Sequence, residues 1–453
     1  MTNRITPQFP KFLVTVCLVA TFLAAQPFVR AQDKVQDKDR DRALSMLRRI
    51  KNELKKNYYD PKFHGMDLEA RFKTAEDKIK TDTSVGQIFG TIAQVLIELE
   101  DSHTFFLPPS RAYTTDYGWT MQIIGDRCFV STVDKGSDAE ARGVKPGDEV
   151  VEAGGYKIDR TNLWKFQYLY TALRPQPHIR ATLRSPSGEI RELDLLAKRR
   201  DGKRITDLTN YNEYMDLVRK SQREDDIGRD RYKSFGDQLL IWKMNEFDLT
   251  DSQVDDALDR VRKHQALILD LRGNGGGWVT TIQRLLANLV DHDVKIGDSV
   301  SRKETKPLLA KTRGEKAYKG KLVILVDSRS ASASEVLART IQLEKRGTVI
   351  GDRSAGAVME SRRFSDEVGL DVVVFYGASI TVSDLIMTDG QSMEHLGVTP
   401  DDVRLPSAQD LAAGRDTVLS YAASLFGVTL RLRQASCFRS NDRRRATSFG
   451  KSV

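Results

Sequence analysis

The chain has 453 residues, of which 40% are hydrophobic and 30% charged; this composition excludes a disordered chain, and three cysteines are too few for a disulfide framework. Its formal net charge of +8 is concentrated at the two ends, because residues 1–31 carry three bases and no acid, and residues 431–453 carry seven bases and one acid. The 61 bases and 62 acids between these ends leave no excess of positive charge, which argues against binding to nucleic acid.

The N-terminal segment has the pattern of an export signal. Arg4 and Lys11 precede an apolar stretch of 14 residues, 12–25, and Ala31 provides a small residue before Gln32. This stretch suits a signal peptide and is short for a helix that spans a membrane. Residues 1–31 therefore predict an exported protein, periplasmic or extracellular. Because Arg30 lies close to the cleavage point, an uncleaved signal that anchors the protein is the alternative.

Residues 32–110 predict a small helical unit. Apolar side chains recur at intervals of three and four residues from Ala43 to Leu54, and the same periodicity returns over 72–79 and 85–99. Pro108 and Pro109 then end the regular structure.

Residues 116–198 predict a small β domain, with strand-like runs at 121–124, 128–133, 149–153 and 179–183. The string SDAEARGVKPGD predicts a short helix closed by Gly143 and followed by a Pro-Gly turn. This segment resembles a PDZ domain in its permuted form. The resemblance implies that it binds C-terminal or extended peptides. It also implies a peptide-binding loop made of Tyr117, Gly118, Trp119 and Thr120. A β domain without a ligand is the alternative.

Residues 199–235 are polar and predict a linker or insertion with helix at 211–220. Residues 236–428 then alternate strands with helices, which predicts a mostly parallel or mixed sheet. The strands are expected at 239–244, 266–270, 321–326, 348–351 and 372–375, and the helices at 251–263, 279–289, 335–343 and 408–426, the last broken at Gly414. Residues 429–453 predict a solvated basic tail, for which weak contact with a membrane surface stays open.

Two loops follow buried strands, where α/β folds place their active sites. Residues 270–277, DLRGNGGG, can form either an oxyanion hole or a structural turn. Phosphate binding is excluded, since G-x-G-x-x-G would need glycine where Trp278 stands. In the second loop, Ser332 lies between two alanines at the start of a helix, as an exposed nucleophile would. Ser334 can also be a simple N-cap.

The strings ALILDLRGNGGG and VILVDSRSASASE together resemble the C-terminal-processing, or tail-specific, serine peptidase family over residues 40–428. The resemblance implies a multidomain α/β fold, in which a crotonase-like protease domain carries an inserted PDZ-like domain and a small N-terminal helical unit. It also implies that Ser332 is the nucleophile. One departure matters, because the Ser–Lys branch of the family has a lysine base where this chain has Gly356-Ala357-Val358.

A histidine offers another base. The string LEDSHT contains Ser102 and His103, and an imidazole is the usual group that activates a serine near neutral pH. This string resembles the tricorn core protease branch, which implies a tetrad of Ser102, His103, Ser332 and Glu394. Glu335 and Glu360 compete with Glu394 for its role, and His395 is predicted to lie on the surface. The resemblance further implies an oxyanion hole made by Gly275 or Gly276 together with Ala333.

The sequence thus predicts an exported serine endopeptidase that acts on proteins or peptides through an acyl-enzyme and needs neither metal nor cofactor. One alternative is an inactive peptide-binding pseudoprotease, suggested by the missing lysine. An enzyme resembling acyl-CoA hydratases would share the fold, but it leaves the PDZ-like segment unexplained. Cys128 and Cys437 are either free thiols or one disulfide.

Overall fold

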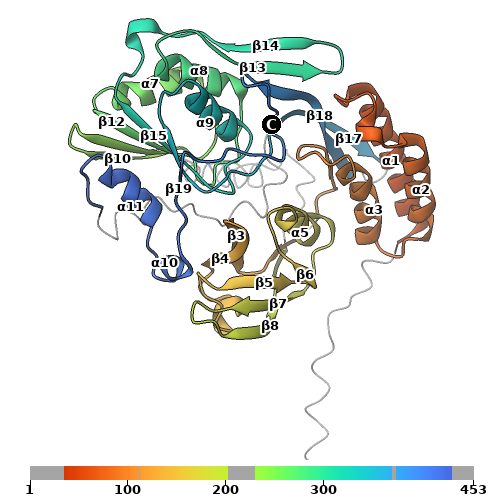
Figure 1. The fold of residues 1–453 in the computed structure, drawn as a ribbon. Helices are drawn as coiled ribbons and strands as arrows, with labels where there is room; N and C mark the ends of the chain where they lie inside the picture. Colours follow the sequence, from red (N-terminus) through yellow and green to blue (C-terminus); the bar gives the residue numbers. More distant parts are fainter. Residues whose placement is uncertain (1–34, 112, 202–229, 370–373, 431–453) are drawn as a thin grey trace, which may run out of the picture.

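The computed structural model describes residues 35–111, 113–201, 230–369 and 374–430. The predicted signal segment, the helix expected at 211–220, Cys437 and the basic tail lie outside these ranges. Figure 1 shows three parts, namely an N-terminal group of helices, a small β domain and a larger α/β domain. None of the helices in the described ranges combines the length and the apolar character that crossing a membrane requires.

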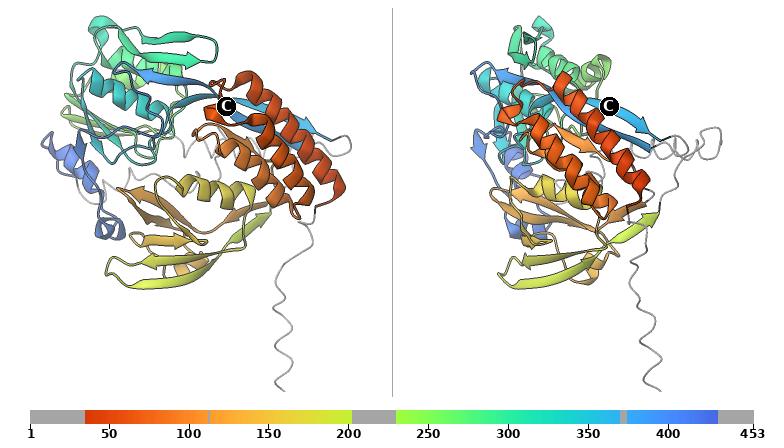
Figure 2. Two further views of the ribbon diagram at one scale, coloured as in Figure 1. Left: turned by 45° about the vertical axis from the view of Figure 1, so that its right-hand side comes forward. Right: turned by 90° about the vertical axis from the view of Figure 1, so that its right-hand side faces the viewer.

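The N-terminal part contains the helices α1 (Asp37–Asn57), α2 (Leu68–Thr81) and α3 (Val85–Ile97), with a 3-10 turn η1 (Phe63–Gly65) after α1. The predicted periodicity is confirmed, because Leu47, Leu54 and Ile92 are buried on the inner faces of these helices. Figure 2 shows α1–α3 lying against long strands of the α/β domain. This packing joins the helical part to the domain that contains Ser332.

The β domain forms an antiparallel sheet in the order β3-β4-β5-β7-β8, with β6 paired to β5. Its elements are β3 (Trp119–Ile124), β4 (Arg127–Val133), α4 (Asp138–Ala141), β5 (Glu149–Ala153), β6 (Tyr156–Lys157), α5 (Leu163–Tyr168), η2 (Leu169–Leu173), β7 (His178–Arg184) and β8 (Ile190–Leu196). Trp119 and Thr120, which were predicted to lie in a loop, are the first residues of β3. The alternation of buried Trp119, Met121 and Ile123 explains this, since they pack into the domain core.

The predicted linker, 199–235, has strands at both ends. Its first residues belong to β9 (Lys198–Asp201), which pairs with β2 (Tyr113–Asp116), so the chain enters and leaves the β domain through a two-stranded ribbon. Its last residues form β10 (Arg231–Phe235), which pairs antiparallel with β11 (Leu239–Lys243).

The α/β domain is built on a six-stranded sheet in the order β10-β11-β12-β15-β16-β19, which is parallel from β11 onward. Along β11, Leu240 and Trp242 face a core that includes the helices α7 to α9, whereas Leu239 and Ile241 face α11. Helices on both faces confirm the predicted α/β class. The remaining elements are α7 (Asp251–Val261), β12 (Ala266–Asp270), α8 (Val279–Leu289), η3 (Gly314–Lys316), β15 (Lys321–Val326), α9 (Ala333–Leu343), β16 (Thr348–Gly351), β19 (Asp402–Val403), α10 (Ala408–Ala412) and α11 (Thr417–Ser424).

A second sheet connects this domain to the N-terminal helices. It contains β1 (Phe105–Leu107), β13 (Val294–Ser301), β14 (Thr305–Ala310), β17 (Met359–Val368) and β18 (Val374–Met387). The sequence predicted only residues 372–375 here, because charged residues such as Arg362 and Arg363 interrupt any apolar run in β17. Since β1 pairs with β18, the preceding turn with His103 is held beside the α/β domain.

Candidate active site

The glycine-rich loop and the serine loop meet at one edge of the six-stranded sheet. They follow β12 and β15, which are neighbouring parallel strands, so their carboxyl ends lie side by side. Asn274 holds the two loops together, because its carbonyl oxygen accepts hydrogen bonds from Ala331 N–H at 3.0 Å and from Ser334 Oγ at 3.0 Å.

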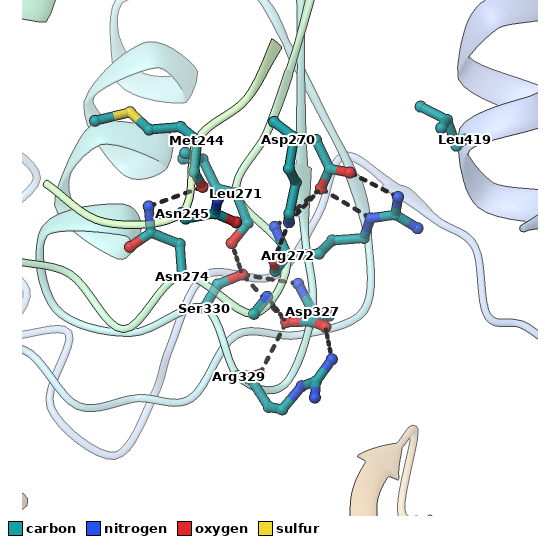
Figure 3. Close-up of polar contacts among 12 residues, drawn as sticks. Met244, Asn245, Asp270, Leu271, Arg272, Asn274, Asp327, Arg329, Ser330 and Leu419 are labelled. Carbon is teal, nitrogen blue, oxygen red and sulfur yellow. Dashed lines mark hydrogen bonds and ion pairs between the residues drawn. The ribbon is translucent and has the colours of Figure 1, made fainter. Parts of the chain in front are cut away.

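Buried charged groups and hydroxyls link the two loops and support them, as Figure 3 shows. Ser330 Oγ donates to the carbonyl of Leu271 at 2.9 Å, and Gly273 N–H donates to Asp327 Oδ1 at 2.7 Å. Asp270 pairs with Arg272 at 2.7 Å. Burial alone would raise the pKa of Asp270, but the charges of Arg272 and Lys243 lower it to about 2. Ionised and hydrogen-bonded side chains therefore support both loops.

Ser332 has an unusual backbone conformation, with φ 55° and ψ −118°. For a residue with a side chain this left-handed region costs about 1–3 kcal/mol, and such strain is found at functional sites. It is held there by its N–H, which donates to Ala357 O at 2.9 Å and to Glu335 Oε2 at 2.9 Å. Ser332 is half-buried and immediately precedes α9.

The backbone donors around Ser332 are not equivalent. Gly276 N–H donates to Asn274 Oδ1 at 2.8 Å, so it is already engaged. Among the described residues, the N–H groups of Gly275 and Ala333 have no hydrogen-bond partner. Gly276 is nevertheless required, because with φ 100° a Cβ there would stand 2.7 Å from Ser332 Cβ. Of the two glycines left open by the sequence, the geometry favours Gly275 as an oxyanion donor.

His103, Ser102 and Glu394 form a connected chain of hydrogen bonds. Ser102 Oγ donates its single proton to Glu394 Oε2 at 2.9 Å, so the contact of 2.7 Å between Ser102 Oγ and His103 Nδ1 has the ring nitrogen as donor. Ser102 N–H also donates to Glu394 Oε1 at 2.7 Å. This network assigns the proton of the neutral ring to Nδ1 and leaves Nε2 as a proton acceptor.

Burial shifts the pKa of both titratable groups in this chain of hydrogen bonds, His103 and Glu394. It lowers the pKa of His103 below its usual value, against the opposing charge of Asp101, so the ring is neutral at pH 7. It also raises the pKa of Glu394, against hydrogen bonds from Val358 N–H and from Ser102. A neutral imidazole beside a hydrogen-bonded carboxyl group is suited to accept a proton.

His103 and Ser332 line the same large cavity, of about 3630 Å³, which extends from the serine loop to the β domain. They make no hydrogen bond to each other within the described part of the chain. Ser102, Gly275, Gly276 and Ala333 also line this cavity. Of the predicted peptide-binding residues, Tyr117, Trp119 and Thr120 line it, whereas Gly118 does not.

The competitors of Glu394 have other partners. Glu335 is fully buried and accepts hydrogen bonds from Ser332 N–H, Gly356 N–H, Ala357 N–H and Ser354 Oγ. The sequence offered it only as an alternative acid, and its position three residues after Ser332 was the available signal. Glu360 accepts a hydrogen bond from Ser383 Oγ at 2.7 Å and takes no part in the hydrogen bonds that join Glu394, Ser102 and His103. His395 is exposed, as predicted.

Asp101 was missed by the sequence analysis, although it stands in the same LEDSHT string. It is buried, and its Oδ1 accepts hydrogen bonds from the N–H groups of His103 and Thr104. Cys128 is buried and has no disulfide partner among the described residues, which do not include Cys437. Within the described ranges, no three potential metal-binding side chains of histidine, cysteine or acidic type come together.

Comparison with known sequences identifies relatives. Residues 238–404 match the family described as Peptidase family S41. The chain is 24% identical over 363 residues to the chloroplastic C-terminal processing peptidase of Tetradesmus obliquus, covering 76% of this chain and 73% of the relative. It is 23% identical over 373 residues to the carboxy-terminal processing protease CtpA of Bacillus subtilis, covering 80% and 68% of the two chains.

Solved structures show the same fold. Mature CPAF complexed with lactacystin aligns with a TM-score of 0.62 at 15% identity, covering 86% of this chain and 98% of that one. The photosystem II D1 C-terminal processing protease aligns with a TM-score of 0.50 at 20% identity, covering 85% and 97%. The resemblance predicted from the two loops is thus confirmed: residues 238–404 match Peptidase family S41, and the chain is similar to the C-terminal processing peptidases over about three quarters of its length.

Proposed function

We propose that the protein hydrolyses peptide bonds through an acyl-enzyme formed on Ser332, with His103 as the base. The observation that carries this proposal is the hydrogen-bond chain from Glu394 through Ser102 to His103 Nδ1, because it leaves Nε2 free to accept a proton in the cavity that Ser332 also lines. The same chain disfavours a pseudoprotease, since the role of the missing lysine is filled by an oriented imidazole.

In the proposed reaction, Ser332 Oγ attacks the scissile carbonyl carbon while its proton moves to His103 Nε2. The N–H groups of Gly275 and Ala333 stabilise the oxyanion, each by about 3 kcal/mol of barrier. The imidazolium then gives its proton to the leaving amine, and Glu394 stabilises the ring's charge through Ser102. Water, deprotonated by His103, hydrolyses the acyl-enzyme and restores Ser332. Substrate binding brings His103 Nε2 and Ser332 Oγ into contact.

A fluorophosphonate probe tests the nucleophile. The native protein is expected to become labelled at a single site, since the probe phosphonylates only a serine whose hydroxyl is activated by a base. The Ser332→Ala variant is expected to lose all labelling, whereas Ser330→Ala, at the buried serine two positions earlier, keeps a label if folded. Labelling of Ser332→Ala at the native level, measured by in-gel fluorescence and peptide mass spectrometry, contradicts the proposal.

The β domain, residues 116–198, is proposed to be a PDZ-like module that holds the C-terminal tail of the substrate. Its strand β3 is at the edge of the sheet, where an added peptide can pair. Tyr117, Trp119 and Thr120 line the cavity that also contains Ser332, so one extended peptide could reach both. The relatives named for C-terminal processing support this choice of substrate.

Two peptides of identical sequence, one ending in a carboxylate and the other in an amide, test tail recognition. We expect kcat/KM to be about 10-fold higher for the carboxylate, because loop N–H groups of PDZ-like domains bind the charged terminus. A short substrate that cannot reach from Ser332 to β3 provides the control, and its two forms are expected to be cleaved equally. Equal kcat/KM for the two long peptides would eliminate this role.

Residues 1–31 are proposed to direct the protein to the periplasm or the extracellular space, on the strength of the basic start and the apolar stretch over 12–25. N-terminal sequencing of the mature protein is expected to begin at Gln32, and a chain that retains Met1 would contradict cleavage.

A further inference from the structure

A buried carboxylate supports the turn that carries His103. Asp101 is only 3% exposed. Its Oδ1 accepts hydrogen bonds from His103 N–H at 3.0 Å and from Thr104 N–H at 2.6 Å, and its Oδ2 accepts one from Tyr58 OH at 2.8 Å. The carboxylate therefore accepts the backbone N–H groups on both sides of the His103 side chain.

The same carboxylate ties this turn to the α/β domain. Thr381 of β18 donates its hydroxyl to Asp101 Oδ1 at 2.7 Å, and its N–H donates to Thr104 Oγ1 at 3.0 Å. Tyr58, on the other oxygen, follows the last residue of α1. Asp101 thus lies where α1, β18 and the His103 turn meet, and it joins all three.

We infer that Asp101 is a positioning residue for peptide hydrolysis: it fixes the backbone turn that places the His103 ring in the cavity and stabilises the charged form of that ring. The inference rests on the proposed function, in which His103 is the base. Asp101 acts on the backbone of His103, whereas Glu394 acts on its ring through Ser102, so the two acids have separate tasks.

The charge of Asp101 also acts on the ring of His103. Burial lowers the pKa of His103, and the charge of Asp101 is the one that opposes this shift. Loss of that charge should therefore lower the pKa further. The titratable or charged groups around the turn include Glu100 of the turn itself and groups from the helical part, from β18 and from the segment of Glu394, namely Tyr58, Tyr59, Asp60, His64, Asp384, Glu394 and His395.

Two substitutions separate the two tasks of Asp101. Asp101→Asn keeps the shape and an acceptor oxygen but removes the charge, so the pKa of the His103 ring is expected to fall below its value in the native protein. Asp101→Ala also removes the acceptor for both N–H groups, and kcat/KM is expected to fall about 100-fold as the ring loses its position. The ring is observed by NMR titration of histidine-labelled full-length protein, where its signal among the six histidines is identified with His103→Ala.

Asp82→Asn is the matched control, since Asp82 is also a buried acid of the helical part and accepts from Thr91 Oγ1 at 2.8 Å. It is expected to leave the His103 titration unchanged. The inference is overturned if Asp101→Asn leaves that titration unchanged, or if folded Asp101→Ala keeps native kcat/KM. If instead His103→Ala itself remains fully active, the proposed function fails, whatever the Asp101 variants do to the ring.

Discussion

Replacing His103 with alanine is expected to lower kcat/KM about 10⁴-fold, which corresponds to about 5.5 kcal/mol of lost transition-state stabilisation. Without the imidazole, Ser332 loses the base that is proposed to accept its proton. Other described acids near the site, Glu335 and Glu394, have their oxygens occupied by hydrogen bonds from backbone and serine groups. Residual activity would come from the oxyanion donors and from substrate binding alone.

The measurement is the hydrolysis of a peptide with a free C-terminal carboxylate, followed at several pH values. His292→Ala is the matched control, because that histidine is exposed and pairs with Glu344 instead of lining the cavity. It should hydrolyse the peptide at the native rate. A folded His103→Ala enzyme that keeps more than a tenth of native kcat/KM would exclude His103 as the base.

The positions of the two active-site loops could be predicted because their strands are unbroken apolar runs. The bounds of α8, β15 and β16 agree with the expected ranges, and Ser332 immediately precedes α9, close to the helix start that its pattern indicated. Single-sequence patterns recognise the strands, since burial on both faces of a sheet requires a continuous run of apolar residues, and they recognise the helices by apolar residues at intervals of three and four.

The second sheet could not be predicted in the same way. In β17 charged and apolar residues intermingle, because one side of the strand faces solvent or cavity, and its pairing with β18 is a tertiary contact. The supporting roles of Asp101 and Glu335 were hidden for a similar reason. Asp101 accepts a hydrogen bond from Thr381, 280 positions away in the sequence, and the spacing of neighbouring residues cannot predict such a contact.

The donors of the proposed oxyanion hole also could not be predicted from the sequence. Spacing could not distinguish Gly275 from Gly276, since both lie in the same run of glycines. The distinction depends on the side chain of Asn274, which turns back to accept the N–H of Gly276. A family resemblance thus suggested the proposed tetrad, whereas the partners of its members could be identified only from the structure.

Replacing Glu335 with glutamine is expected to lower kcat/KM about 10²–10³-fold while the chain still folds. Oε1 of Glu335 accepts from Ser354 Oγ and Gly356 N–H, and Oε2 accepts from Ala357 N–H and Ser332 N–H. In either orientation, an amide would place its NH₂ group against at least one backbone N–H. Each buried donor left unpaired costs about 1–3 kcal/mol, and the Ser332 turn can relieve that cost only by moving.

The same substitution should change how stability depends on pH. Burial raises the pKa of Glu335 from 4.5 to about 7, against its hydrogen bonds, which lower it. The folded chain therefore binds more protons than the unfolded chain in this window, and the contribution of Glu335 to the free energy of unfolding falls by about 3 kcal/mol as pH rises through it. Glu335→Gln lacks this titration, so its stability relative to the native protein should increase between pH 4.5 and 7.

Thermal unfolding at a series of pH values measures the difference, with Glu315→Gln, at an exposed position of η3, as the control. The control should follow the native pH dependence and retain native kcat/KM. Parallel stability curves for the native protein and Glu335→Gln would mean that the carboxyl group stays ionised throughout, with its four donors outweighing burial. Native kcat/KM in a folded Glu335→Gln enzyme would show that Glu335 does not position Ser332.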